Sequence, residues 1–303
     1  MSLSNTPDPA IRQAVVRQDL DNVLHPIVQH RALETSQVVV TAAEGSTIYD
    51  ADGTGYLDAM AGLWCVNIGY GRSELADVAA DQMRQLSYFP HSAMNVPAAA
   101  LAETINELMG GGYHTYFVNS GSEANEAGFK FARQYMKHEY PGQYRFKTIS
   151  RYFAYHGTTL ATLDAGGMGE RKAKFEPFSG DFVHVAHPHC YRCPFGLSYP
   201  SCNLACVKNL ETAILGEGPE TVAAVLVEPI MSGVGVAGRP TNTCRKSKSC
   251  AGNTTCCCTS TRSSTALAAP ARCSRTSITA SRRTSSPSPR AFPAPTCRLP
   301  RRW

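Results

Sequence analysis

Residues 117–127, Phe-Val-Asn-Ser-Gly-Ser-Glu-Ala-Asn-Glu-Ala, join two different periodic patterns. The apolar, β-forming residues 113–118 predict a buried strand that leads into this segment. Apolar residues at helical spacing then predict a helix over residues 123–140. A strand that turns through Ser-Gly-Ser into a helix presents backbone N–H groups at the positive end of the helix dipole. The segment therefore predicts an anion-binding site.

Two residues of this turn suit an anion. Gly121 lets the backbone approach a ligand closely, and the hydroxyl group of Ser122 can donate a hydrogen bond. A structural alternative is that Ser122 caps the helix and that Glu126 stabilises its first turn. On the pattern alone we favour the cap, because serine is a common capping residue.

Residues 120–127, Ser-Gly-Ser-Glu-Ala-Asn-Glu-Ala, resemble the phosphate-binding turn of the class III aminotransferases, which use pyridoxal phosphate. The chain resembles in particular the ω-amino acid:pyruvate and aspartate aminotransferase-like members, from near its N-terminus to about Ala237. The resemblance implies an α/β protein of fold type I, with a large domain built on a mostly parallel sheet and the N-terminal part of a small α+β domain. We expect the small-domain part in residues 1–60 and an incomplete cofactor-binding domain in residues 61–237.

The same resemblance assigns roles to individual residues. It implies that the cofactor is held by Ser120, Gly121, Ser122, Tyr155, His156 and Glu228. Tyr155 would stack on the cofactor ring, Glu228 would lie beside it, and Trp64 would form a wall of the substrate pocket. Taken alone, Glu228 indicates an ordinary carboxylate at a strand end, His156 a structural histidine and Trp64 equally a core aromatic. The ordered set of segments, not any one of them, carries the assignment.

The family also implies an activity. The complete enzyme would move an amino group from an amine or ω-amino acid to pyruvate or a related keto acid, and it would act as a homodimer. The sequence has no apolar run of 18 residues, so we expect no membrane span. Its first residues lack a charged-then-apolar leader, and we expect a cytoplasmic protein.

The remaining periodicity supports an α/β organisation. Short β-forming runs predict an antiparallel meander over residues 38–41, 46–49 and 56–59. Further strands are predicted over residues 146–150, 182–185 and 221–227. Helical patterns cover residues 9–24, 73–86, 97–108 and 203–215. Because strands and helices alternate after residue 120, we expect a largely parallel sheet with its ligand site beyond the carboxyl ends of the strands.

Four cysteines follow the second of these parallel strands. The spacing Cys190-x2-Cys193 and Cys202-x3-Cys206 is compatible with a zinc knuckle. Similar segments occur in this group of aminotransferases without an evident metal role, so we favour no metal and free thiols, as in a reducing cytoplasm.

The charge of the chain is divided unevenly. Glu228 is the last acidic residue, and 13 of the 29 Lys and Arg residues follow Ala237. The first 237 residues therefore carry 16 basic against 24 acidic side chains, whereas the tail is only basic and contains seven of the 12 cysteines. The tail has little apolar periodicity, so we expect residues 238–303 to be disordered and non-native.

A shift of the reading frame explains this break. The family continues with a His-Ile-Asp-Glu strand, whose Asp binds the ring nitrogen, and an Ala-Lys-Gly segment with the Schiff-base lysine, and both are missing from this frame. Codons for residues 256–262, read from the third base, can give Leu-Leu-His-Ile-Asp-Glu. The same offset over residues 285–292 can give Val-Thr-Val-Ala-Lys-Gly. We therefore expect a frameshifted and inactive aminotransferase with no catalytic residue present.

An alternative is a natural, non-enzymatic protein whose basic tail binds nucleic acid through its phosphates. The tail has only two aromatic residues, Phe292 and Trp303, for stacking on bases. We therefore favour the frameshift, and nucleic acid is not an expected partner.

Overall fold

A computed structural model describes residues 9–26, 28–35, 37–228, 230–237 and 257–260. The chain forms two units, Met1–Ala93 and Met94–Trp303, and each is described by itself. The tail predicted to be disordered lies outside the described residues, except for 257–260.

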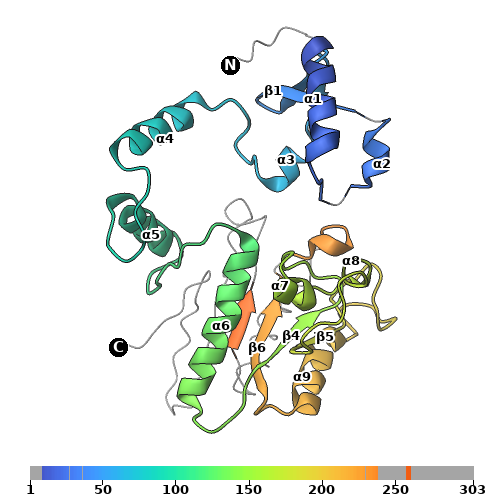
Figure 1. Cartoon of the computed structure of the whole chain (residues 1–303). Coiled ribbons are helices and arrows are strands. Elements are labelled where there is room, and N and C mark those ends of the chain that lie inside the picture. The colour runs from blue at the N-terminus through green and yellow to red at the C-terminus, as the bar shows by residue number, and fades with distance from the viewer. Residues whose placement is uncertain (1–8, 27, 36, 229, 238–256, 261–303) are drawn as a thin grey trace. The chain divides into compact units, whose positions relative to one another are not determined.

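The first unit contains the predicted antiparallel meander (Figure 1). Its strands β1 (Val40–Glu44), β2 (Thr47–Asp50) and β3 (Gly55–Leu57) lie in the order β1-β2-β3. The Asp50 carboxylate fixes the β2–β3 turn, because it accepts hydrogen bonds from the backbone N–H groups of Asp52 and Thr54 and from the Tyr56 hydroxyl, at 2.8–3.0 Å. The helices of this unit are α1 (Pro9–Asn22), α2 (His30–Leu33), α3 (Ala61–Trp64) and α4 (Ser73–Gln85).

Trp64 lies on an unusual turn of the first unit. All four residues of α3 have positive φ, between 48° and 67°, so the segment is a left-handed turn that non-glycine residues rarely adopt. Asp58 holds it by accepting from the N–H of Gly62 at 2.6 Å and from the hydroxyl of Tyr70 at 2.7 Å. Trp64 is 47% exposed.

The second unit contains the predicted parallel sheet. Its strands β4 (Lys147–Arg151), β5 (Phe182–Val185), β6 (Val222–Val227) and β7 (Cys257–Ser260) lie in the order β5-β4-β6-β7, and all neighbours are parallel. The helices are α5 (Val96–Leu108), α6 (Gly121–Glu139), α7 (Leu160–Ala165), α8 (Gly169–Lys172) and α9 (Ala205–Glu217), followed by the 3-10 turn η1 (Ser232–Val234).

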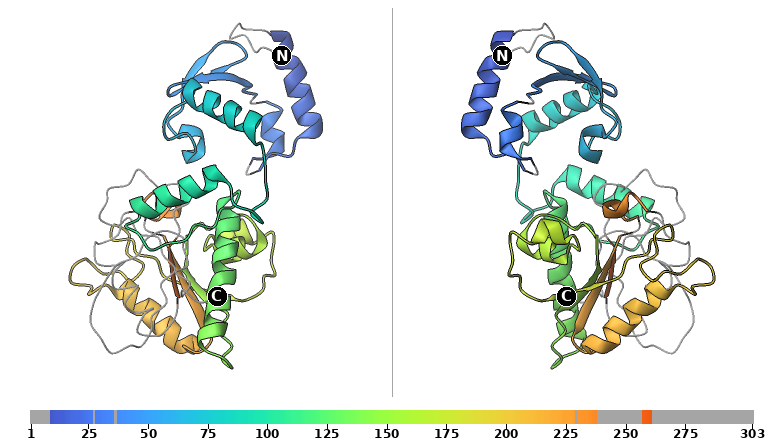
Figure 2. Two further views of the ribbon diagram at one scale, coloured as in Figure 1. Left: turned by 90° about the vertical axis from the view of Figure 1, so that its left-hand side faces the viewer. Right: turned by 90° about the vertical axis from the view of Figure 1, so that its right-hand side faces the viewer.

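Strand β6 lies at the centre of the core. All six of its residues are buried, as its unbroken apolar sequence predicts for a parallel strand covered on both faces. Figure 2 shows the strands between the green helix α6 and the yellow helix α9. Met136 of α6 and Leu210 and Ile214 of α9 pack into one cluster with the sheet. The strands predicted over residues 146–150, 182–185 and 221–227 and the helices predicted over residues 97–108, 123–140 and 203–215 are confirmed, with ends that differ by one or two residues.

Two predictions about strands differ from the structure. Residues 113–118, predicted to be a strand, have no regular secondary structure. An extended segment becomes a strand only where a neighbour exchanges hydrogen bonds with it, and among the described strands none pairs with this one. Conversely, β7 lies in the tail, where no strand was predicted. Pairing with β6 depends on backbone groups, so a sequence without apolar periodicity can still satisfy it.

Candidate active site at the carboxyl edge of the parallel sheet

The carboxyl ends of β4 and β6 bring two predicted site segments together. Tyr155 follows β4 by four residues, and Glu228 follows β6 directly. The backbone N–H of Tyr155 donates a hydrogen bond to Glu228 Oε1 at 3.1 Å. The parallel register explains this contact, because neighbouring parallel strands end at the same edge of a sheet.

The cap of helix α6 is not the residue that the structural alternative proposed. Ser120 is the N-cap, and its hydroxyl oxygen accepts from the N–H of Glu123 at 3.1 Å. Glu123 Oε2 in turn accepts from the N–H of Asn119 at 2.6 Å, an arrangement close to a capping box. The expectation that Ser122 caps the helix and Glu126 stabilises its first turn is therefore wrong. Both residues face a different segment.

That segment is the loop that follows Tyr155. Ser122 Oγ accepts from the N–H of Thr158 at 3.1 Å, and Glu126 Oε1 accepts from the hydroxyl of Thr159 at 2.7 Å. Between them along the helix, the buried Asn125 donates from Nδ2 to the carbonyl oxygen of His156 at 2.6 Å. Three hydrogen bonds therefore join the first turns of α6 to residues 156–159.

Sequence reasoning missed Asn125 and Thr159 as part of this arrangement. The signal available was the spacing of Ser122, Asn125 and Glu126, which lie at positions i, i+3 and i+4 and therefore share one helix face. When the first turns of a helix carry several polar residues on one face and the rest of the helix packs on a sheet, that polar face is expected to contact another polar segment.

Replacement of Asn125 with alanine should lower the stability of the second unit. The change leaves the buried carbonyl of His156 without this donor, and we expect the free energy of unfolding to fall by about 1–2 kcal/mol. Urea denaturation followed by circular dichroism would measure it. Asn22→Ala is a matched control, because its amide donates to the carbonyl oxygen of Gln18 within helix α1 in an exposed contact. Equal effects of the two substitutions would contradict the importance of the Asn125 contact.

Burial changes the ionisation of Glu228 and His156 at this edge. Burial raises the pKa of Glu228 to about 7, although the Tyr155 N–H and the charge of Arg151 act in the opposite direction. Burial lowers the pKa of His156 to about 3, and His184 and Arg151 add to this effect. At neutral pH, His156 is therefore uncharged, whereas Glu228 is close to its own midpoint.

The edge also contains a polar atom without a partner among the described residues and a partly exposed aromatic ring. Glu228 Oε2 is buried and has no hydrogen-bond partner within the described part of the chain. The Tyr155 ring is half-buried, and the guanidinium group of Arg171 lies 5.2 Å from its centroid.

The structure also places the two remaining predicted site residues. Trp64 lies in the other unit, Met1–Ala93, and Gly121 is the first residue of α6.

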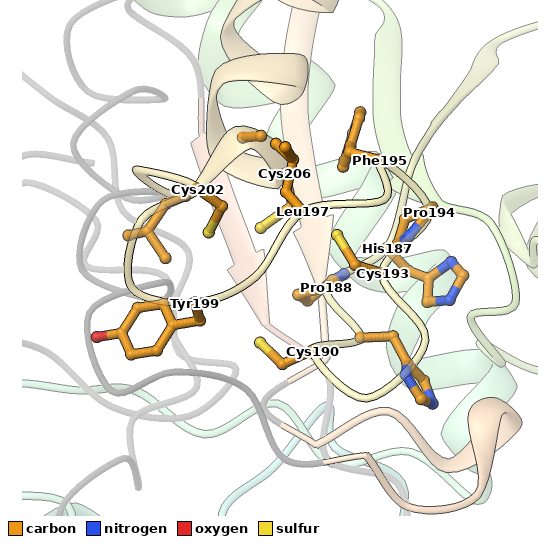
Figure 3. A pocket seen from close by; sticks show the side chains of 13 residues that line it. His187, Pro188, Cys190, Cys193, Pro194, Phe195, Leu197, Tyr199, Cys202 and Cys206 are labelled. Carbon is orange, nitrogen blue, oxygen red and sulfur yellow. The ribbon is translucent and has the colours of Figure 1, made fainter.

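The four cysteines line a separate pocket, three of them from the loop between β5 and α9 and Cys206 from the start of α9. Cys190, Cys193, Cys202 and Cys206 surround a small cavity of about 20 Å³ (Figure 3). All four are free thiols, and burial raises the pKa of Cys190 and Cys206. Among the described residues, no three His, Cys, Asp or Glu side chains converge on a point where they could hold a metal ion.

Comparison with known proteins identifies the family. The family model for class III aminotransferases matches residues 28–256, which extends past Ala237. The chain belongs to the class III aminotransferases. The match confirms the predicted family, and the parallel sheet confirms the predicted α/β fold. Members of this family depend on pyridoxal phosphate.

Individual relatives agree with this assignment. The uncharacterized aminotransferase YhxA of Bacillus subtilis is 47% identical over 210 residues, which are 69% of this chain and 45% of that protein. The hypotaurine/taurine–pyruvate aminotransferase of Paracoccus denitrificans is 38% identical over 75% of this chain and 49% of its own length. The chain thus spans about half the length of the curated relatives it matches.

Solved structures show the same relationship. A Bacillus anthracis aminotransferase has a TM-score of 0.79 and 39% identity, over 84% of this chain and 56% of its own. An omega transaminase of Pseudomonas jessenii, solved in complex with PMP, has a TM-score of 0.76 and 31% identity, over 81% of this chain and 55% of its own.

In the described part of our chain, none of the helices has the length and apolarity needed to cross a membrane.

Proposed function

We propose that this class III aminotransferase chain carries the cofactor half of an active site that transfers an amino group from an amine or ω-amino acid to pyruvate or a related keto acid. The observation that carries the proposal is the convergence of the α6 start, the Tyr155 loop and Glu228 at one edge of the sheet. Relatives named for taurine–pyruvate and putrescine–pyruvate transfer support pyruvate as acceptor. A cytoplasmic homodimer is part of the proposal.

The residues at this edge fit pyridoxal phosphate. Its phosphate would be held by Ser120, Gly121 and Ser122, since the first N–H groups of α6 lack intrahelical partners. Ser122 Oγ already accepts from Thr158, so its own hydroxyl hydrogen remains to donate to the phosphate. When bound, the cofactor supplies an electron sink for the reaction.

The remaining residues would orient the ring. Tyr155 presents a half-buried aromatic face, and the buried Oε2 of Glu228 gains a polar neighbour if a ligand occupies the edge. His156 supports the loop through its carbonyl oxygen, which is bound by Asn125. Trp64, in the first unit, would contribute to the substrate pocket.

The frameshift is also a proposal, and the backbone of β7 supports it. The register places residue 260 level with Val227, next to Glu228 in the chain. In the shifted frame, the four codons that begin within residues 257–260 read Leu-His-Ile-Asp, so the aspartate codon spans positions 260 and 261. The missing carboxylate would then lie at the same edge of the sheet as Tyr155 and Glu228.

Replacement of Ser122 with alanine should weaken cofactor binding. The substitution removes one donor to a phosphate dianion, which corresponds to a roughly tenfold increase in Kd. Titration of the chain with pyridoxal phosphate, monitored by protein fluorescence, would measure it. Ser201→Ala is a control, because the Ser201 hydroxyl donates to the carbonyl oxygen of Ser198 in an exposed loop before α9. Unchanged affinity in Ser122→Ala would show that the phosphate turn is wrongly placed.

A further inference from the structure

A cluster of four thiol groups surrounds one small cavity of the second unit. Cys190 and Cys193 come from the loop after β5, Cys202 from the turn before α9, and Cys206 from the first turn of α9. Figure 3 shows their sulfur atoms pointing toward the same space. All four are free thiols, and the proposed function uses none of them.

The cavity between these thiols is too small for a bulky ligand. Its volume of about 20 Å³ is enough for one water molecule. Little empty space therefore separates the side chains that line it. A metal ion does not fit the geometry, because no three of the described His, Cys, Asp and Glu side chains could hold one. A reaction between two of the thiols needs no third ligand.

The four thiols differ in their access to solvent. Cys190 is exposed, whereas Cys193, Cys202 and Cys206 are partly buried. A dissolved oxidant can therefore reach Cys190 most readily, and the thiols behind it can react with a group that Cys190 already carries. Burial is the main cause of the raised pKa of Cys190, and the negative charge of Cys202, followed by that of Cys193, adds to it. Among the thiols, Cys202 therefore acts most strongly on the exposed one.

We propose that Cys190 and Cys202 form a reversible disulfide when the chain meets a low-molecular-weight disulfide such as glutathione disulfide. The Cys190 thiolate attacks one sulfur atom of the oxidant, whose S–S bond breaks, and one glutathione leaves as the thiol. The Cys202 thiolate then attacks the Cys190 sulfur, forms the intramolecular S–S bond and releases the second glutathione. The two cysteines together lose two electrons and two protons, and the oxidant gains them.

The new bond would lie next to the candidate site. His187 lines the same cavity, and its ring centroid lies 5.0 Å from that of Phe153, two residues before Tyr155. A disulfide restricts the segment that it encloses, here residues 190–202. It would therefore restrain the loop that packs against the Tyr155 segment.

Trypsin separates the two cysteines of this proposal. Cleavage after Lys174, Arg192 and Lys208 leaves Cys190 in peptide 175–192 and Cys202 in peptide 193–208. The reduced full chain is incubated with glutathione disulfide, alkylated, digested without reductant and analysed by mass spectrometry. We expect the two peptides to be joined through Cys190 and Cys202. This product should exceed Cys190 bound to glutathione by about tenfold or more, because the second attack is intramolecular.

Two variants and an unfolded control test whether the cavity selects this pair. Cys202→Ser should lower the yield of joined peptides about tenfold and leave Cys190 bound to glutathione, whereas Cys193→Ser should leave the yield unchanged. Oxidation in concentrated urea should distribute the bonds over several cysteines, because no cavity then holds the two thiols together. An undiminished yield in Cys202→Ser, a link from Cys190 to another cysteine in the folded chain, or the same pairing and yield in urea overturns the proposal.

The mapping does not depend on the variants or on the cofactor. If a variant fails to fold, the pairing in the unsubstituted chain, compared with and without urea, still decides the proposal. No step uses pyridoxal phosphate, so a failure of the Ser122→Ala titration would contradict the proposed function and leave this result intact.

Discussion

The 303-residue chain, supplied with pyridoxal phosphate, an amine donor and pyruvate, should form no alanine above the uncatalysed rate. Transamination needs a lysine that carries the cofactor and then moves a proton, and no Ala-Lys-Gly segment is present in this frame. The lysines after Lys208 are Lys246 and Lys248, which lie in a different context and outside the described residues. At the end of β7 this frame has Ser260 and Thr261, where the proposed shifted frame would encode the aspartate that holds the ring nitrogen protonated.

Restoring the reading frame should produce the activity. A gene corrected just before the break would encode both the aspartate beside Glu228 and the lysine segment, and we expect the rate of alanine formation to rise about 10³-fold or more. Alanine formation is measured with the original and the corrected proteins at equal concentration. Alanine formed at an enzymatic rate by the original chain, and surviving the replacement of Lys246 and Lys248, would contradict the catalytic argument. The encoding DNA tests the frameshift independently.

Replacement of Gly157 with alanine should destabilise the second unit and weaken cofactor binding together. Gly157 has φ +138°, in a region that favours glycine, and an added Cβ would contact Ser122 Oγ and approach Thr162 Oγ1 to 2.6 Å. The strain and the overlap together should lower the free energy of unfolding by about 3 kcal/mol. Because Ser122 must move to relieve the overlap, the Kd for pyridoxal phosphate should rise as well.

Gly142→Ala separates backbone strain from overlap. Gly142 also has a positive φ, of 84°, but nothing lies within 4 Å of its added Cβ, so we expect a loss of only about 1 kcal/mol and an unchanged Kd. Urea denaturation and cofactor titration measure both quantities on each variant. Equal losses at the two glycines would contradict the close packing of the Tyr155 loop on Ser122.

The sequence alone determined the parts of this protein that depend on local pattern. The apolar run of β6, the helical spacing of α6 and the Ser-Gly-Ser turn between strand-like and helical residues indicated an α/β fold with a site at the carboxyl edge of the sheet. The sharp change in charge after Ala237 marks a change in composition, although the family model continues to residue 256. These features depend on the spacing of apolar and charged residues along the chain, which can be read directly from the sequence.

Only the tertiary structure decided which polar groups are hydrogen-bonded to one another and which segments pair as strands. Residues 113–118 have strand-like composition but no paired neighbour among the described strands, whereas β7 has weak strand character and pairs with β6. The cap is Ser120 because the helix begins at Gly121, and Ser122 lies inside the first turn, where its hydroxyl oxygen accepts from the N–H of Thr158. Asn125 and His156 are 31 residues apart in sequence, and Tyr155 and Glu228 are 73 apart. Such contacts depend on where the strands end in space, and no local period encodes that.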